Sequence, residues 1–178
     1  MTAVFKKVWN LITSILVALV VLLAIALVGV RLIGLKTYVV LSGSMEPAYP
    51  TGSLIYVKEV DVHQLKEQDV ITFMIDEDTI ATHRIIEVLV DEEDSSVIRF
   101  RTQGDANDSP DGSLVHYKNV IGSPIFCVPY LGYVANFIQN PPGKYLSIGF
   151  GAILLVLVFL PDLLGDDDEN KKKDKVKE

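Results

Sequence analysis

Cysteine is nearly absent from this chain of 178 residues, occurring only as Cys127, so no intrachain disulfide can form. Its apolar neighbourhood, Ile-Phe-Cys-Val-Pro, favours a small buried side chain. Histidine is also scarce, and the 16 lysines and arginines are outnumbered by 23 acidic residues. The formal net charge of -7 argues against nucleic acid as a partner, because phosphate-binding surfaces gather Lys and Arg.

Charged residues are missing altogether from residues 11–30. Twenty helical residues at about 1.5 Å each cover the roughly 30 Å hydrocarbon core of a bilayer, so this stretch is predicted to be a transmembrane helix. A cleaved signal peptide is the alternative. Its apolar region would be shorter, about 7 to 15 residues, and no small-x-small cleavage site precedes Arg31.

A second apolar run covers residues 145–164 and follows the helix breakers Asn140-Pro141-Pro142-Gly143. It is predicted to be a second transmembrane helix. The alternative is a buried hairpin packed on the soluble core, because Pro161-Asp162 shortens the clean apolar length. Residues 165–178 contain mostly acids and lysines and no aromatic residue, so we expect a disordered, charged tail.

Lysines flank the two apolar runs and fill the tail, which favours a cytoplasmic location for both termini, residues 1–10 included. Two spans then make a multi-pass protein of the cell membrane, with residues 38–140 outside the cytoplasm. The segment 38–143 holds 16 of the 23 acids and only 6 of the 16 basic residues. Such a balance suits a solvated domain on the trans side, where no positive-inside pressure applies.

The intervening domain is predicted to be mainly β, with antiparallel strands. Its apolar residues fall in short runs separated by turn clusters, and no dozen-residue amphipathic helix interrupts them. The predicted strands cover residues 53–60, 70–75, 79–90, 97–102 and 114–121.

Three segments of this domain carry residues suited to nucleophilic catalysis, which needs a nucleophile, a base and oxyanion donors. The first is Ser42-Gly43-Ser44 before Met-Glu-Pro, the second is Thr-His83-Arg in a strand pattern, and the third is the acidic loop 102–111. Each has an ordinary structural interpretation as well. Ser-Gly-Ser occurs in turns, strand histidines often lie at the surface, and acidic loops form Asx turns.

In this order, Ser-Gly-Ser-Met-Glu-Pro, Thr-His-Arg and Thr-x-Gly-Asp-x-Asn resemble the motifs of type I signal peptidases, in the endoplasmic-reticulum-type branch with a Ser/His pair. The resemblance implies that Ser44 is the nucleophile, Ser42 helps form the oxyanion hole and His83 is the base. It assigns Asp111 as the third catalytic residue. The supporting residue is Asp105. Ser-Pro precedes Asp111 where a second acid is expected, so Asp108 remains an alternative.

The resemblance also implies a function: membrane-bound serine endopeptidase activity that removes N-terminal signal peptides from translocated preproteins. Small residues would precede the cut by one and three positions. The expected partners are preproteins, the lipid bilayer and the translocation machinery, with no cofactor and no metal. Two alternatives are a self-cleaving repressor, which the first span opposes, and a non-catalytic membrane-anchored scaffold or partner module in secretion.

Overall fold

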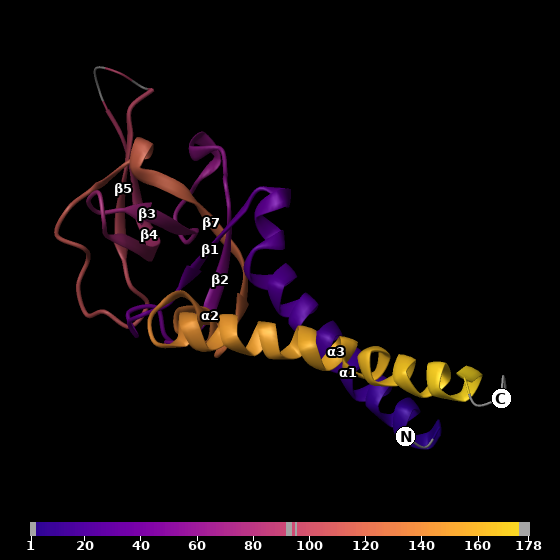
Figure 1. The fold of residues 1–178 in the computed structure, drawn as a ribbon. Coiled ribbons are helices and arrows are strands. Elements are labelled where there is room, and N and C mark those ends of the chain that lie inside the picture. Colours follow the sequence, from indigo (N-terminus) through magenta and orange to yellow (C-terminus); the bar gives the residue numbers. More distant parts are fainter. Residues whose placement is uncertain (1–2, 92–93, 95, 175–178) are drawn as a thin grey trace. The chain divides into compact units, whose positions relative to one another are not determined.

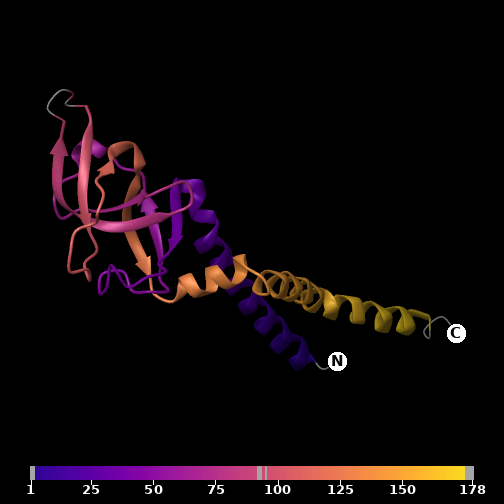
Figure 2. The ribbon, with the colours of Figure 1, turned by 90° about the vertical axis from the view of Figure 1, so that its left-hand side faces the viewer.

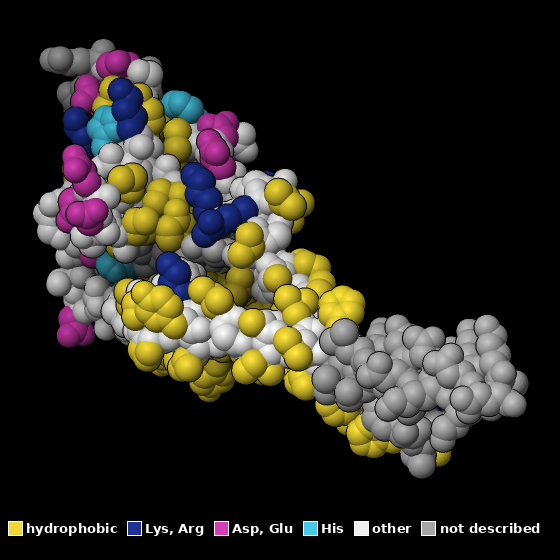
Figure 3. All heavy atoms as spheres, in the orientation of Figure 1, with side chains coloured by type: hydrophobic (Ala, Val, Ile, Leu, Met, Phe, Trp, Pro, Cys, Tyr) yellow, Lys and Arg dark blue, Asp and Glu magenta, His cyan; other side chains and the backbone are white. Residues whose placement is uncertain are grey.

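The computed structural model describes residues 3–91, 94 and 96–174 of the chain. They divide into a helical unit, Met1–Ala26 with Phe137–Glu178, and a β unit, Leu27–Asn136. Figure 1 labels the strands of the β unit and the long helices α1 and α3. In the view of Figure 3, hydrophobic side chains gather on the described part of the long helices, whereas the coloured charged side chains lie over the β unit. The two units therefore differ in the surface that they present.

The helical unit contains α1 (Ala3–Leu27) and α3 (Gly143–Asp174). Within α1, the segment Lys7–Leu27 is long and apolar enough to cross a membrane. The predicted N-terminal apolar helix is thus confirmed, although it ends three residues earlier than expected, at Leu27. Inside this unit the indole Nε1 of Trp9 donates a hydrogen bond to the backbone oxygen of Leu157, at 3.2 Å.

The C-terminal half differs from the sequence prediction in two ways. Helix α2 (Leu131–Gln139) was not predicted. It is long and apolar enough to cross a membrane only together with Gly143–Phe159, as one span that is broken between the two helices. A separate second span over residues 145–164 is therefore not shown. Helix α3 also continues to Asp174, where a disordered tail was expected from residue 165. Acids stand four positions before lysines in that sequence, a spacing that favours helix. Residues 175–178 lie outside the described residues.

The β unit is built on a seven-stranded sheet in the order β1-β2-β7-β3-β4-β5-β6. Every neighbouring pair is antiparallel, which confirms the predicted mainly β fold. Figure 2 shows β4 and β5 as a long hairpin within the sheet. The strands are β1 (Leu35–Val39), β2 (Leu54–Lys58), β3 (Val70–Met74), β4 (Ile80–Val90), β5 (Ile98–Gln103), β6 (Val115–His116) and β7 (Val120–Val128).

The structure changes the predicted strand list at both ends of the sheet. Strand β1 was not predicted, and the expected strand 114–121 is divided into β6, a 3-10 turn (Tyr117–Asn119) and the start of β7. The ring Nδ1 of His116 accepts a hydrogen bond from the backbone N–H of Lys118 at 3.2 Å, which stabilises that turn. Two further 3-10 turns are Gly29–Ile33 and Val62–Gln64.

Two hydrophobic clusters fix the strands that carry the site. The larger contains residues of β3 to β6: Ile71, Phe73, Ile85, Ile98, Phe100 and Val115. The smaller packs Leu54 and Tyr56 of β2 against Ala135 of α2. Burial of aliphatic and aromatic side chains stabilises each cluster, and the larger cluster includes residues of both β4 and β5. Cys127 is only half-buried in β7, so the buried side chain expected from its apolar neighbours is not found.

Candidate active site

The segment Ser42 to Pro47 follows β1 as a tight loop. The backbone N–H of Glu46 donates to the oxygen of Gly43 at 3.0 Å, and the Glu46 carboxylate accepts a hydrogen bond from the Thr51 hydroxyl at 3.0 Å. Met45 is 2% exposed, so its side chain anchors the loop in the interior. This anchoring leaves Ser44 beside Ser42, with 3.3 Å between the two Oγ atoms.

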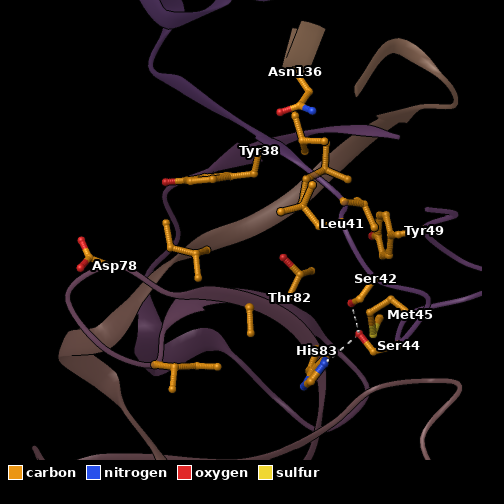
Figure 4. A pocket seen from close by; sticks show the side chains of 16 residues that line it. Tyr38, Leu41, Ser42, Ser44, Met45, Tyr49, Asp78, Thr82, His83 and Asn136 are labelled. Atoms are coloured by element: carbon orange, nitrogen blue, oxygen red, sulfur yellow. Dashed lines mark hydrogen bonds between the residues drawn. The ribbon is translucent and has the colours of Figure 1, made fainter. Parts of the chain in front are cut away.

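His83 lies on β4 opposite Ile71 of β3, and its ring forms an edge-to-face pair with Phe73 at a centroid distance of 6.2 Å. Its Nε2 is 3.1 Å from Ser44 Oγ, a contact drawn in Figure 4. Its Nδ1 is 2.6 Å from Asp111 Oδ2. Only 13% of the His83 side chain is exposed, because the strand and its neighbours enclose it. Both ring nitrogens are therefore engaged, one by the serine and one by the carboxylate.

Asp111 closes the acidic loop against the end of β5. Its backbone N–H donates to the oxygen of Thr102 at 2.8 Å, and its Oδ2 accepts a hydrogen bond from the Thr102 hydroxyl at 2.6 Å. Among the described residues, Asp111 is the carboxylate in hydrogen-bonding contact with the His83 ring, and Asp108 makes no such contact. The geometry thus favours Asp111 over Asp108 as the partner of the histidine.

Asp105 lies in the same loop but contacts a different group. Its two carboxylate oxygens accept hydrogen bonds from Nε and NH2 of Arg84, at 2.8 and 2.7 Å, and NH1 of Arg84 reaches the oxygen of Gln68 at 2.8 Å. The hydrogen bond to Asp105 raises the pKa of the Arg84 guanidinium above its ordinary value. Asp105 is thus part of an ion pair that holds the loop to β4.

The acidic loop also contacts the serine loop directly. The backbone N–H of Ala106 donates to the oxygen of Ser44 at 2.9 Å. A Cβ on Gly104 would lie 2.5 Å from that same oxygen, so the approach is possible only without a side chain. Sequence reasoning missed the roles of Arg84, Thr102 and Gly104, although all three stand inside the recognised motifs.

A cleft of about 590 Å³ extends from Ser44 and His83 along the β unit. Figure 4 shows Ser44 and His83 near one end, with Tyr38, Asp78 and Asn136 toward the other. The lining of the cleft includes Tyr38 and Val39 of β1 with the following residues Val40 to Ser42, and Ile80 to His83 of β4. Among the described residues, no group of three or more His, Cys, Asp or Glu could hold a metal ion.

Two strand edges contribute to the lining of this cleft. Strand β1 is the terminal strand of the sheet. In β4, the described pairing with β5 begins only at Arg84, so Ile80 to His83 pair with β3 alone. Such edges can accept an extended peptide as an added strand. Tyr49 also lines the cleft, and burial raises the pKa of its phenol.

The contacts form a chain from a hydroxyl to an imidazole to a carboxylate. In this chemistry the imidazole accepts the hydroxyl proton, and the carboxylate fixes the tautomer and stabilises the imidazolium. Residues 11–124 match the family model described as "Signal peptidase, peptidase S26". Because the match covers more than half of its length, the chain belongs to this family.

Named relatives point the same way. Signal peptidase I W of Bacillus subtilis (strain 168) is 39% identical over 123 residues, which are 65% of this chain and 63% of that protein. The signal peptidase complex catalytic subunit SEC11C of Homo sapiens is 32% identical over 128 residues, 66% of each chain. The subunit SEC11 of Fusarium vanettenii is 30% identical over 129 residues, 67% of this chain and 73% of that protein. The chain thus spans about two thirds of the length of these relatives.

Proposed function

We propose that this protein is a membrane-anchored serine endopeptidase that removes N-terminal signal peptides from preproteins. The observation that carries the proposal is the contact chain in which His83 lies 3.1 Å from Ser44 Oγ and 2.6 Å from Asp111 Oδ2. Family membership and the relatives named signal peptidase support the substrate class. The apolar helix α1 fits an anchor in the membrane.

The first half-reaction forms an acyl-enzyme. Ser44 Oγ attacks the scissile carbonyl while His83 Nε2 takes its proton, and the resulting imidazolium is stabilised by Asp111 at Nδ1. The negative charge on the carbonyl oxygen is then stabilised by the backbone N–H of Ser44 and by the Ser42 hydroxyl. When the C–N bond breaks, His83 returns the proton to the leaving amine. The released amine is the new N-terminus of the mature protein.

The second half-reaction uses the same groups with water as the nucleophile. His83 Nε2 accepts a proton from water, which attacks the ester carbon of Ser44. Collapse of the second tetrahedral intermediate breaks the ester bond and returns the proton to Ser44 Oγ. The signal peptide leaves as a free carboxylate, and the enzyme returns to its starting state.

The cleft suits a substrate segment in extended form. Its two open strand edges supply backbone hydrogen bonds, which bind a peptide without regard to its sequence. Its lining includes Val39, Leu41, Ile80 and Ala81, whose side chains leave room for small apolar residues rather than charged ones. This agrees with the small residues that the family resemblance implies before the cut.

The membrane arrangement and partners are part of the same proposal. Helix α1 forms one span, and α2 with α3 forms a second, broken span, which leaves both termini in the cytoplasm and the β unit outside. The acidic charge of that unit suits the trans side of a membrane. Substrates would arrive from the translocation machinery already tethered in the bilayer.

The test is cleavage of a preprotein by the purified full-length chain in detergent. Wild-type protein should release the mature domain, and Ser44→Ala should reduce cleavage by about 10⁶-fold, to background. Ser96→Ala is the matched control because Ser96 lies in the β4–β5 turn, bonded to Asp94 at 2.6 Å, and should cleave normally. Cleavage by Ser44→Ala at the wild-type rate would refute the proposal. Absence of cleavage by a folded wild-type protein would favour the non-catalytic scaffold.

A further inference from the structure

Thr102 is a fully buried polar residue whose role is not explained by packing alone. It is the second-last residue of β5 and pairs with Ile85 of β4, and its relative exposure is 0%. A buried hydroxyl that lacks a hydrogen bond destabilises a protein, so the partner that it selects is informative. Here that partner is Oδ2 of Asp111, at 2.6 Å.

The same carboxylate oxygen also faces His83 Nδ1 at 2.6 Å. Two short hydrogen bonds therefore converge on Asp111 Oδ2, one from the strand that carries Thr102 and one from the histidine. The backbone adds a third tie, because the N–H of Asp111 donates to the oxygen of Thr102 at 2.8 Å. Backbone and side chain of one threonine thus fix both the position of Asp111 and the rotation of its carboxylate.

We propose that Thr102 is a positioning residue for the reaction, which holds the Asp111 carboxylate in the orientation that aligns the His83 ring with Ser44. This inference rests on the proposed function. Thr102 does not reach the serine or the cleft itself, so it acts through Asp111. A carboxylate with only the histidine as partner could rotate toward solvent, since 24% of the Asp111 side chain is exposed.

The consequence concerns turnover rather than substrate binding. The Thr102 hydroxyl lies behind the carboxylate, and the cleft is lined by other residues, so KM should be insensitive to its loss. Misorientation of the carboxylate would instead weaken the stabilisation of the imidazolium in the transition state and lower kcat. A hydrogen bond to a charged group typically contributes enough for a loss of about tenfold to a hundredfold.

The experiment compares Thr102→Val with Thr102→Ser in the full-length protein, with kcat and KM measured on a preprotein. Valine keeps the shape and removes the hydroxyl, whereas serine keeps the hydroxyl and removes a methyl group. Thr72→Val is the matched control, because Thr72 is equally buried in the same sheet and its hydroxyl bonds Thr82 Oγ1 at 2.8 Å, away from Asp111. Thermal unfolding of all three variants reports their folded state.

We expect Thr102→Val to lower kcat by about tenfold to a hundredfold with KM within about twofold, and Thr102→Ser to restore kcat to within about threefold of wild type. A kcat for Thr102→Val equal to that of Thr72→Val would overturn the proposal. So would equal losses in the serine and valine variants, which indicate packing rather than the hydroxyl. An inactive wild type would refute the proposed function instead, so the two failures are distinguishable.

Discussion

The aspartates Asp105 and Asp111 lie six residues apart in one acidic loop, yet they make different kinds of contact. Asp111 accepts hydrogen bonds from His83 and Thr102, whereas Asp105 forms a two-point ion pair with the guanidinium of Arg84. One carboxylate is thereby connected to the serine through the histidine. The other attaches the loop to β4, and its backbone N–H donates to Sδ of Met45, the residue after the serine, at 3.4 Å.

The difference arises from neighbouring residues on a single strand. His83 and Arg84 are consecutive in β4, and successive side chains of a strand point to opposite faces. The loop that begins after β5 bends back so that its first aspartate meets the arginine and its last meets the histidine. The role of each carboxylate is thus set by the residue that it faces across the fold, and not by its own local sequence.

Of the substitutions in this loop, Asp111→Asn should lower kcat the most. The amide keeps the size of the side chain but cannot stabilise the imidazolium or hold the same tautomer, so we expect kcat to fall by about 10⁴-fold in a folded protein. Asp108→Asn is the matched control and should stay within about twofold of wild type in the same assay. Equal losses in both variants would mean that the loop as a whole, rather than the contact with His83, supports turnover.

Gly104→Ala tests the contact between the acidic loop and the serine loop. A Cβ at this position would lie 2.5 Å from the Ser44 oxygen, so one of the two loops must shift. A displacement of about 1 Å at a reacting group can cost about a hundredfold in rate, and we expect kcat/KM to fall by that amount. Gly112→Ala is the control, because a Cβ there meets nothing within 4 Å. Wild-type rates in Gly104→Ala would show that the loops can separate without harm to the serine.

Asp105→Asn and Arg84→Gln should each have a smaller effect, since the ion pair acts only through loop position. We expect kcat/KM to fall by about tenfold in either variant, and the double variant to lose little more, with a coupling free energy of about 1 kcal/mol. The control is the ion pair between Glu87 and Arg101, whose Oε2 and Nε atoms are 2.8 Å apart. This pair also joins two strands, but it lies away from the site. Additive losses in the double-mutant cycle would contradict this prediction, because they would mean that Asp105 and Arg84 affect the rate independently of their ion pair.

The sequence predicted the fold class and the first apolar helix because these depend on patterns within a short window. Alternating apolar residues and turn clusters indicate strands wherever both are strong, as in β4. Strand β1 lacks that pattern: its residues Leu-Lys-Thr-Tyr-Val are ordered by pairing with β2. Helix α3 likewise continues to Asp174, beyond residue 164, where the second apolar helix was predicted to end.

The site was predictable only in part. Ser44, His83 and Asp111 were selected through the family resemblance, because residues separated by 39 and 28 positions give no local signal that they will meet. The structure brings them together, while their catalytic roles stay a proposal. Thr102 stands in the loop motif, but its contact could not be predicted from the sequence, since a threonine at the end of a strand is ordinary. Its importance comes from the oxygen that it contacts, which is a tertiary property.

A third aspartate, Asp76, also lies in a loop, and its substitution should have the smallest effect of those compared. Asp76, in the β3–β4 turn, accepts hydrogen bonds from the backbone N–H groups of Thr79 and Asp78 at 2.7 and 2.9 Å. Hydrogen bonds from Thr79 and then Asp78 lower the pKa of the Asp76 carboxyl below its ordinary value of 3.8. A lowered folded-state pKa stabilises the protein above the unfolded-state pKa, and this contribution is lost as the pH falls through the folded value.

Asp76→Asn should therefore leave activity at neutral pH unchanged and reduce the decline of the apparent unfolding temperature between about pH 5 and pH 3. Asparagine still offers an oxygen to the turn but does not titrate in this range, so the pH dependence that Asp76 contributes should disappear. Thermal unfolding of the full-length protein at several pH values measures this slope. Glu77→Gln, which replaces a neighbouring acid whose carboxylate makes no described turn bond, should leave the slope unchanged. An unaltered slope in Asp76→Asn would mean that this turn opens before the β unit unfolds.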